Sequence, residues 1–246
     1  MIKTNSHQET VKTKTDSIAI FKEETPETET DLFHILLPTT YRIWEKDDLT
    51  KQLNSDWFEL CEEDGDYFIK KAKYTISKGY DDCAGTETKS IDTDRKTLLL
   101  LEYKKLAVGK VEHLNILKQF IWPDEESELV FNNQKYYLRA EGKIKSSEDR
   151  TNETGENEVW HDVEDYKLFI KTETSKEELL LFQESFHDTF VKVIFIGDLD
   201  KDEKLDFIFE ANRDYEERRV ILFLSSEAKE NKLLQKVSEI SIQFDC

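Results

Sequence analysis

The chain has 246 residues, of which 37% are hydrophobic and 36% charged, and it carries a formal net charge of −19. That charge argues against binding to nucleic acid or to anionic membrane surfaces, because both need clustered lysine and arginine side chains. No apolar run approaches the roughly 18 residues of a transmembrane helix. The 15 Phe, 9 Tyr and 4 Trp residues predict a folded core, because aromatic side chains are largely buried.

The polar, threonine- and glutamate-rich segment 1–30 predicts a flexible N-terminal tail. Two β-rich lobes are expected after it, 31–145 and 159–246, or one continuous domain over 31–246. The polar stretch 145–158 is then either a lobe boundary or a long hairpin connection.

The first half of the chain predicts one short helix and a hairpin. The helix is expected over Asp47–Leu53, where aspartate can cap its start. Two aromatic-rich runs, Trp57–Cys61 and Tyr67–Ile76, flank Asp64-Gly65, a dipeptide typical of two-residue hairpin turns. The glycine-containing stretch Tyr80–Thr93 is expected to be a loop.

Further strands and hairpins follow at short intervals. Strands are predicted over Thr97–Tyr103, Val111–Ile121, Phe190–Ile196, Leu205–Glu210, Arg219–Ser225 and Val237–Phe244. Two more hairpins are predicted, Glu128–Phe131 with Lys135–Ala140 and Tyr166–Ile170 with Leu179–Phe182. The expected fold is mainly β, a β-rich α+β class with antiparallel sheets and hairpins in sandwich-like packing and few short helices.

One loop between two predicted strands carries specific chemistry. The segment GDLDKDEKLDFIF places aspartates at positions 1, 3, 5 and 9 of the loop, with lysine at position 7. Calcium takes six to eight oxygen ligands, from carboxylates and backbone carbonyls. Without a cation, two unit charges at about 4 Å repel by roughly 1–4 kcal/mol. We therefore expect a calcium site built from Asp198, Asp200, Asp202, the Lys204 carbonyl and Asp206, with Lys201 and Lys204 as the competing source of positive charge.

The loop is not an EF-hand. An EF-hand needs a bidentate glutamate at position 12 and a helix on each side. Position 12 is Phe209 and both flanks are predicted strands. A strand–loop–strand setting ties the ion to hairpin geometry, so the expected role is structural.

The segment GDLDKDEKLDFIF resembles the DxDxDGxxD calcium loop of FG-GAP and integrin-alpha-type repeats. The following stretch, LFLSSEAKENKLLQKVSEI, resembles bacterial envelope proteins of unknown function that carry one such loop near the C-terminus. The resemblance covers about 50 of the 246 residues and implies the ligand set given above, with calcium held between two strands. Glu203 stands where that family has glycine, which predicts a positive φ at this residue.

The three cysteines, Cys61, Cys83 and Cys246, allow one disulfide with a free thiol or three reduced thiols. A Cys83–Cys246 pair would staple the end of the last strand. A periplasmic or extracellular location with a removed leader is the expectation, and the cytoplasm remains an alternative.

Three functions stay open. The first is a non-enzymatic extracytoplasmic protein with a structural calcium site. The second is an acidic interaction or immunity-type inhibitor protein that binds a basic partner, which the charge favours. The third is a hydrolase with an unrecognised carboxylate pair, for which Trp57, Trp122 and Trp160 could line a sugar-binding face. No catalytic residue is identified, and the oligomeric state is left open.

Overall fold

The computed structural model describes residues 33–44, 47–151, 155 and 157–245. The predicted tail over 1–30 lies outside the described residues. The residues from Asp31 onward form a compact unit. In the described part of the chain, no helix is both long enough and apolar enough to cross a membrane.

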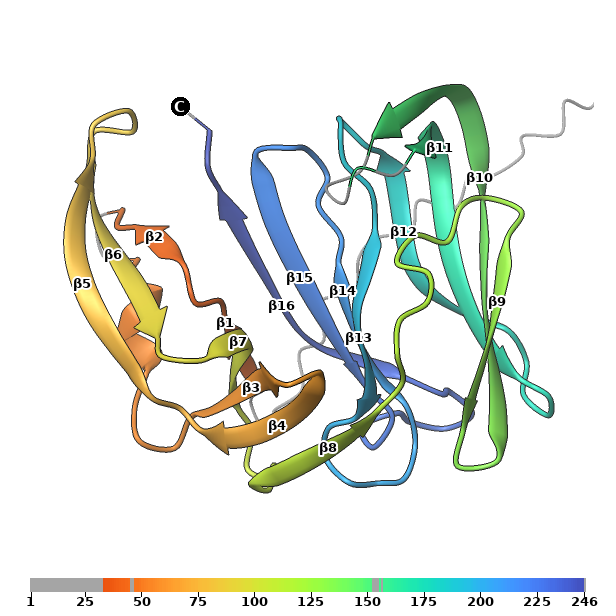
Figure 1. Cartoon of the computed structure of the whole chain (residues 1–246), viewed down its shortest axis with the longest axis horizontal. Helices are drawn as coiled ribbons and strands as arrows, with labels where there is room; N and C mark the ends of the chain where they lie inside the picture. Colours follow the sequence, from red (N-terminus) through yellow and green to blue (C-terminus); the bar gives the residue numbers. More distant parts are fainter. Residues whose placement is uncertain (1–32, 45–46, 152–154, 156, 246) are drawn as a thin grey trace, which may run out of the picture. The chain divides into compact units, whose positions relative to one another are not determined.

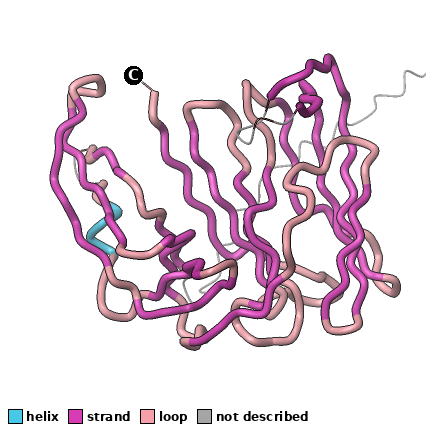
Figure 2. The backbone as a smooth tube through the Cα atoms, in the orientation of Figure 1, coloured by secondary structure: helices cyan, strands magenta, loops and turns pink. Residues whose placement is uncertain are grey.

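Strands dominate the described residues (Figure 2). The sixteen strands are β1 (His34–Leu36), β2 (Thr40–Arg42), β3 (Phe58–Glu63), β4 (Asp66–Lys71), β5 (Tyr74–Asp81), β6 (Thr86–Thr93), β7 (Lys96–Glu102), β8 (Gly109–His113), β9 (Glu126–Phe131), β10 (Gln134–Thr151), β11 (Asn157–Thr172), β12 (Glu178–Ser185), β13 (Lys192–Asp198), β14 (Asp206–Glu210), β15 (Glu217–Leu224) and β16 (Gln235–Gln243). The predicted short helix is a single 3-10 turn, η1 (Leu49–Gln52). The mainly β expectation is confirmed.

The strands form three antiparallel sheets (Figure 1). The largest has nine strands in the order β1-β7-β3-β4-β8-β13-β14-β15-β16. A four-stranded sheet has the order β12-β11-β10-β9, and a three-stranded sheet has the order β2-β6-β5. Strand β8 joins the two halves of the nine-stranded sheet, because it pairs with β4 on one side and β13 on the other.

Strands β14 and β15 bury both of their faces. Ile208 and Leu222 lie in a hydrophobic cluster shared with β1, β3 and β7. Phe207, Phe209 and Phe223 lie in a second cluster, shared with the four-stranded sheet. Side chains alternate between the faces of a strand, so the unbroken apolar runs of β14 and β15 feed two cores at once.

Two of the predicted hairpins have the turns that their sequences demand. Asp64 and Gly65 connect β3 to β4 with φ values of 53° and 87°. Asn132 and Asn133 connect β9 to β10 with φ values of 47° and 63°. Positive φ at both central residues is the geometry of a type I′ turn, which aspartate, asparagine and glycine tolerate best.

Two segments expected to be loops are instead paired strands. The stretch 80–93 contributes to the β5–β6 hairpin, and most of 145–158 belongs to the ends of β10 and β11. Strand β5 and the far half of β10 are exposed along most of their length, and the residues that β6 buries at its start are threonines. These segments therefore lack the apolar alternation by which strands are recognised. The prediction of one strand over Val111–Ile121 is wrong beyond His113, where β8 ends.

The cysteines divide into two environments in the described part of the chain. Cys61 is a buried free thiol in β3. Cys83, in the β5–β6 turn, is disulfide-bonded. Cys246, its expected partner, lies outside the described residues.

Glu217 at the start of β15 is a buried carboxylate held by several donors. Its side chain accepts from the Arg213 main-chain N–H at 2.8 Å and from Ser241 Oγ at 2.5 Å, and it pairs with the Arg213 guanidinium. Burial opposes the charge, but these donors prevail and lower the pKa of Glu217 to about 2.

Glu217→Gln is expected to destabilise the protein by about 2 kcal/mol at neutral pH, because a charged acceptor is lost from a buried network. The contribution of Glu217 is present above its ordinary pKa of 4.5 and is lost as pH falls towards 2. The difference in unfolding free energy between wild type and Glu217→Gln, from urea denaturation, therefore shrinks over that window. The exposed Glu184→Gln is the control, and an equal effect of both variants would contradict the assignment.

Candidate metal centre

The aspartate-rich segment is the connection between β13 and β14. Asp198 ends β13 and Asp206 begins β14, and Gly197 is paired with Asp206 in the ladder between them. The two carboxylates therefore start from adjacent positions at the loop end of one hairpin. Asp206 is fully buried, and Asp198 is 7% exposed.

Gly197 lets β8 approach this hairpin closely. A Cβ at Gly197 would lie 2.5 Å from the carbonyl oxygen of Glu112 and 2.7 Å from the ring of Phe195. Asp198 is paired with Glu112 of β8. The absence of a side chain at Gly197 thus fixes the position from which Asp198 projects.

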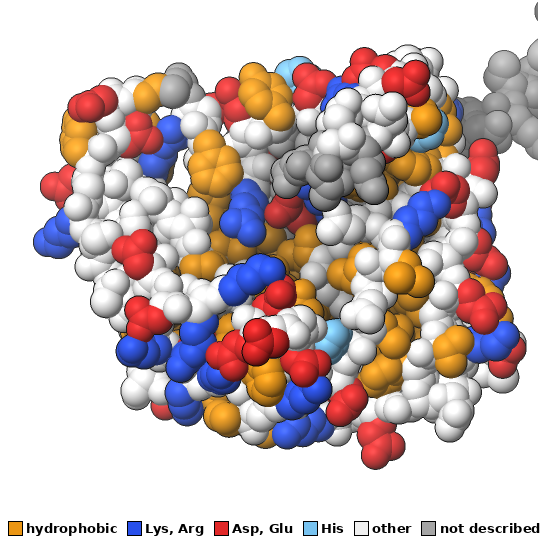
Figure 3. All heavy atoms as spheres, viewed as in Figure 1, with side chains coloured by type: hydrophobic (Ala, Val, Ile, Leu, Met, Phe, Trp, Pro, Cys, Tyr) orange, Lys and Arg blue, Asp and Glu red, His pale blue; other side chains and the backbone are white. Residues whose placement is uncertain are grey.

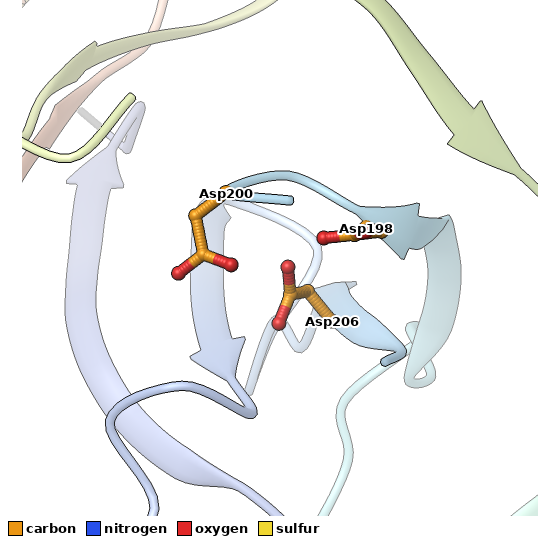
Figure 4. Close-up of side chains that lie close together, drawn as sticks. All are labelled: Asp198, Asp200 and Asp206. Carbon is orange, nitrogen blue, oxygen red and sulfur yellow. The ribbon is translucent and has the colours of Figure 1, made fainter. Parts of the chain in front are cut away.

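Three carboxylates converge at this point. Asp198, Asp200 and Asp206 each offer an oxygen, and these oxygens all lie within 4.8 Å of one another. Figure 4 shows the three side chains turned towards a common space, from the end of β13, the loop and the start of β14. This Asp cluster could hold a metal ion.

Main-chain donors hold two of the carboxylates in place. Asp206 accepts from Leu199 N at 2.8 Å and from Ser225 N at 2.8 Å, with Ser225 Oγ at 3.1 Å. Asp198 accepts from Asp202 N at 3.0 Å and Glu203 N at 2.9 Å. The oxygens are therefore oriented before any ligand is present.

The backbone turns sharply to bring those N–H groups inwards. Glu203 has a φ of 68°, as its place in the resembled motif predicted, and Lys201 has the same value. Positive φ costs a non-glycine residue roughly 1–2 kcal/mol. The loop keeps this conformation because the Asp198 carboxylate satisfies the amides that it exposes.

Asp200 is the least satisfied of the three carboxylates. Its Oδ2 accepts a hydrogen bond from Ser226 Oγ. Its Oδ1 is buried and has no hydrogen-bond partner among the residues that the structure describes. A buried acceptor without a donor is costly, so this oxygen is the one most in need of a ligand.

The environment opposes ionisation of all three groups. Burial raises the pKa of Asp198 and of Asp200 above the usual range. Burial, followed by the charge of Asp200, raises the pKa of Asp206 well above its ordinary value. A bound cation reverses this preference, because it stabilises the deprotonated form.

Neither lysine of the loop neutralises the cluster. Lys204 Nζ lies 3.9 Å from Asp202, and the ammonium of Lys201 lies over Gly109 in β8. The Lys105 ammonium offsets only a small part of the rise in the pKa of Asp200 that burial causes, and it lies 2.5 Å from Glu227. Within the described residues, no lysine or arginine is in ion-pair contact with Asp198, Asp200 or Asp206.

Two of the five predicted ligands lie outside the group of three. Asp202 accepts from Lys204 N at 2.9 Å and from Ser225 Oγ at 2.8 Å. The Lys204 side chain is largely exposed, and its carbonyl stays a prediction. The sequence did not indicate Ser225 and Ser226, because nothing in a Ser-Ser pair after β15 shows that it lies beside the β13–β14 loop.

The four-stranded sheet closes one side of the loop. Asn132 Nδ2 donates to the Glu203 carbonyl at 3.0 Å. Burial raises the pKa of Tyr136, and the charges of Asp202, Asp206 and Asp198 raise it further. Its neutral hydroxyl therefore faces the acidic loop.

No known family, curated protein or solved structure matches the chain. The support for a metal site therefore comes from the geometry of the three carboxylates. Carboxylate and carbonyl oxygens are the donors that hard cations prefer, and the site offers no nitrogen or sulfur ligand among the three clustered residues.

Gly197→Ala is expected to lower the unfolding free energy by about 3 kcal/mol, because the new Cβ meets a backbone carbonyl that cannot move alone. Gly65→Ala is the control: its Cβ meets no atom within 4 Å, but its φ is +87°, so it should cost only about 1–2 kcal/mol. Chemical denaturation compares the two. A loss at Gly197 no larger than at Gly65 would contradict the close-packing argument.

Proposed function

We propose that this protein binds calcium at the β13–β14 loop and that the ion has a structural, non-catalytic role. The observation that carries the proposal is the convergence of three largely buried aspartates, with which no lysine or arginine of the described residues forms an ion pair. Two unit charges about 4 Å apart repel by roughly 1–4 kcal/mol, according to the local dielectric. A divalent cation converts this repulsion into attraction.

Calcium fits the loop better than magnesium or zinc. Zinc sites are usually built from cysteine and histidine, and neither occurs among the clustered side chains. Magnesium demands near-ideal octahedral geometry and keeps much of its water. Calcium accepts an irregular oxygen shell, which three aspartates, a loop carbonyl and water can supply.

The structural role follows from what the carboxylates connect. Asp206 is hydrogen-bonded to Ser225 and Asp200 to Ser226, both just beyond the end of β15. An ion held by Asp198, Asp200 and Asp206 would fasten the β13–β14 loop to that end of the sheet. The resemblance of the loop to FG-GAP-type calcium loops agrees with this role.

We further propose an extracytoplasmic location. The disulfide bond of Cys83 supports it, because disulfides persist mainly in oxidising compartments. Extracellular calcium sites have dissociation constants of roughly 0.1–1 mM. At about 1 mM calcium and a dissociation constant near 0.1 mM, binding would stabilise the fold by about 1.4 kcal/mol.

A second candidate function is binding of a basic protein partner. The net charge of −19 favours it, since opposite charge speeds association. Figure 3 shows acidic and basic side chains intermixed on the face that it draws. No patch of one charge sign on that face indicates a docking site. The structure therefore offers more support for the calcium proposal than for a basic partner.

Calcium at about 1 mM is expected to raise the melting temperature of chelator-treated protein by roughly 3–5 °C, which corresponds to the stabilisation given above. Differential scanning calorimetry measures the shift, with equal magnesium as the control. The rise should saturate with calcium concentration. An unchanged melting temperature at millimolar calcium would refute the proposal.

Asp200→Asn is expected to stabilise the calcium-free protein and to weaken the stabilisation that calcium gives. Without calcium it should stabilise the protein by about 1 kcal/mol, because it removes one of three like charges and gives the unpartnered position a donor. When calcium is added, the melting temperature of this variant should rise much less than that of the wild type, because one charged ligand of the ion is missing.

The matched control for Asp200→Asn is Asp92→Asn, an exposed aspartate that also accepts from a serine, Ser77. It should leave the calcium response intact. Asp202→Asn, measured beside them, shows whether Asp202 is a fourth ligand. A full calcium response in Asp200→Asn would disprove the assignment of the site.

A further inference from the structure

One face of the four-stranded sheet packs on the second hydrophobic cluster, and the other faces outwards (Figure 1). Leu138 of β10 and Leu168 of β11 belong to that cluster. Successive residues of a strand point to opposite faces of the sheet. Arg139 and Phe169, which are paired across the β10–β11 ladder, therefore lie on the outer face.

Apolar side chains gather on the β11–β12 side of this outer face. Leu179 is paired with Phe169, and Phe182 with Lys167, so both β12 residues point outwards. Phe182 is 53% exposed and Leu179 is 45% exposed. Exposed apolar side chains are unremarkable when they are scattered singly, but a group of them indicates an interaction surface.

The cations of the outer face are held by aromatic rings and by carboxylates of the same face. The Arg139 guanidinium lies 4.8 Å from the centre of the Phe169 ring and 2.7 Å from Glu177, just before β12. Lys171 Nζ lies 2.9 Å from Glu126 of β9. The charges are therefore matched within the face and do not call for an oppositely charged partner.

The net charge of this face differs sharply from that of the whole chain. Its strand positions between the β9–β10 turn and the Glu141–Lys167 pair carry four cationic and three acidic side chains, and Glu177 adds one more acid. The face is thus close to neutral in a chain of net charge −19. The cationic residues are Lys135, Arg139, Lys167 and Lys171. The acidic strand residues are Glu126, Glu128 and Glu141.

This difference in charge indicates which partner the face fits. Two copies of a chain with a charge of −19 repel each other wherever their acidic surfaces meet. The outer face is a place where a second copy meets matched charges and an apolar group instead. A contact made by one patch on both copies is closed by a two-fold axis, the commonest symmetry of soluble oligomers.

The size of the face sets the expected strength of such a contact. Four strands about 4.8 Å apart and about 20 Å long present roughly 400 Å² in outline. A standard interface buries about 800 Å² on each partner. The contact should therefore be weak, with a dissociation constant of about 10–100 µM.

We propose that this outer face is the contact between two copies of the chain, packed sheet against sheet around a two-fold axis. Phe169, Leu179 and Phe182 of both copies form its apolar centre, and the matched charges of the four strands form a polar rim. The proposal is independent of calcium, because none of the three clustered aspartates lies on this face.

The test is sedimentation equilibrium of the whole chain at about 5–500 µM, in about 50 mM and about 500 mM NaCl. A monomer–dimer equilibrium with the dissociation constant given above is expected. It should be tighter at the higher salt concentration, because salt screens the repulsion between two acidic chains. The dissociation constant should be the same in calcium and in chelator, so this outcome does not depend on the metal site.

Two variants and a matched control assign the dimer to the outer face. Phe182→Lys and Leu179→Lys each put a cation into the apolar centre and should weaken dimerisation at least about tenfold. Both lower the net negative charge, so a loss of the dimer cannot come from added repulsion. Tyr80→Lys changes an exposed aromatic residue of β5, 61% exposed, and should dimerise as the wild type does. Melting temperatures check that each variant folds.

The proposal is overturned if the wild type stays monomeric at about 500 µM in both salt concentrations, or if its dimer dissociates as salt is added. It is also overturned if both lysine variants of β12 dimerise as the wild type does. A monomer that cosediments with phosphatidylcholine vesicles would assign the face to a lipid surface in place of a second copy.

Discussion

The structure depends on the burial of β14 and β15 from both sides. An antiparallel sheet commonly keeps one face in water, but here the apolar runs around Ile208 and Leu222 serve one core while Phe207 and Phe223 serve the other. Two-sided burial fixes the register of these strands, since a slip by one residue would exchange their faces. The loops at the ends of β14 and β15 are therefore held in defined positions.

The aspartate loop is the chief consequence of that constraint. Asp206 is the first residue of β14, so it is enclosed where the strand enters the double core. Enclosure removes the water that would solvate its charge, and main-chain amides replace only part of that solvation. The same packing that orients the carboxylates therefore makes their unneutralised state unfavourable, which is the physical reason why this cluster could hold a cation.

Strand β8 is the second point on which the arrangement depends. It links β4 to β13, and Gly197 allows it to approach where any side chain would collide with the Glu112 carbonyl. Its short ladder with β13 pairs Gly197 with His113 and Asp198 with Glu112. This brief strand pairing thus accounts for the placement of Asp198 in the acidic cluster.

The sequence by itself determined the β class, the hairpins with Asp-Gly and Asn-Asn turns, and the loop whose aspartates carry the chemistry. These features are local: turn residues set φ, alternation sets faces, and a spacing of two aims carboxylates to one side. It also predicted the positive φ of Glu203. The sequence did not predict β6, most of β5, or the ends of β10 and β11. These strands are mainly exposed or, in β6, bury threonines, and backbone pairing leaves no apolar pattern in the sequence.

Only the tertiary structure decided which aspartates converge. Asp202 has the same spacing as its neighbours, yet it lies outside the group of three, and its carboxylate accepts from Ser225 Oγ, just beyond the end of β15. The position of Lys201 near Gly109 likewise depends on a contact between segments far apart in the chain. Burial and long-range packing set these positions, and neither is encoded in the spacing of residues within one loop.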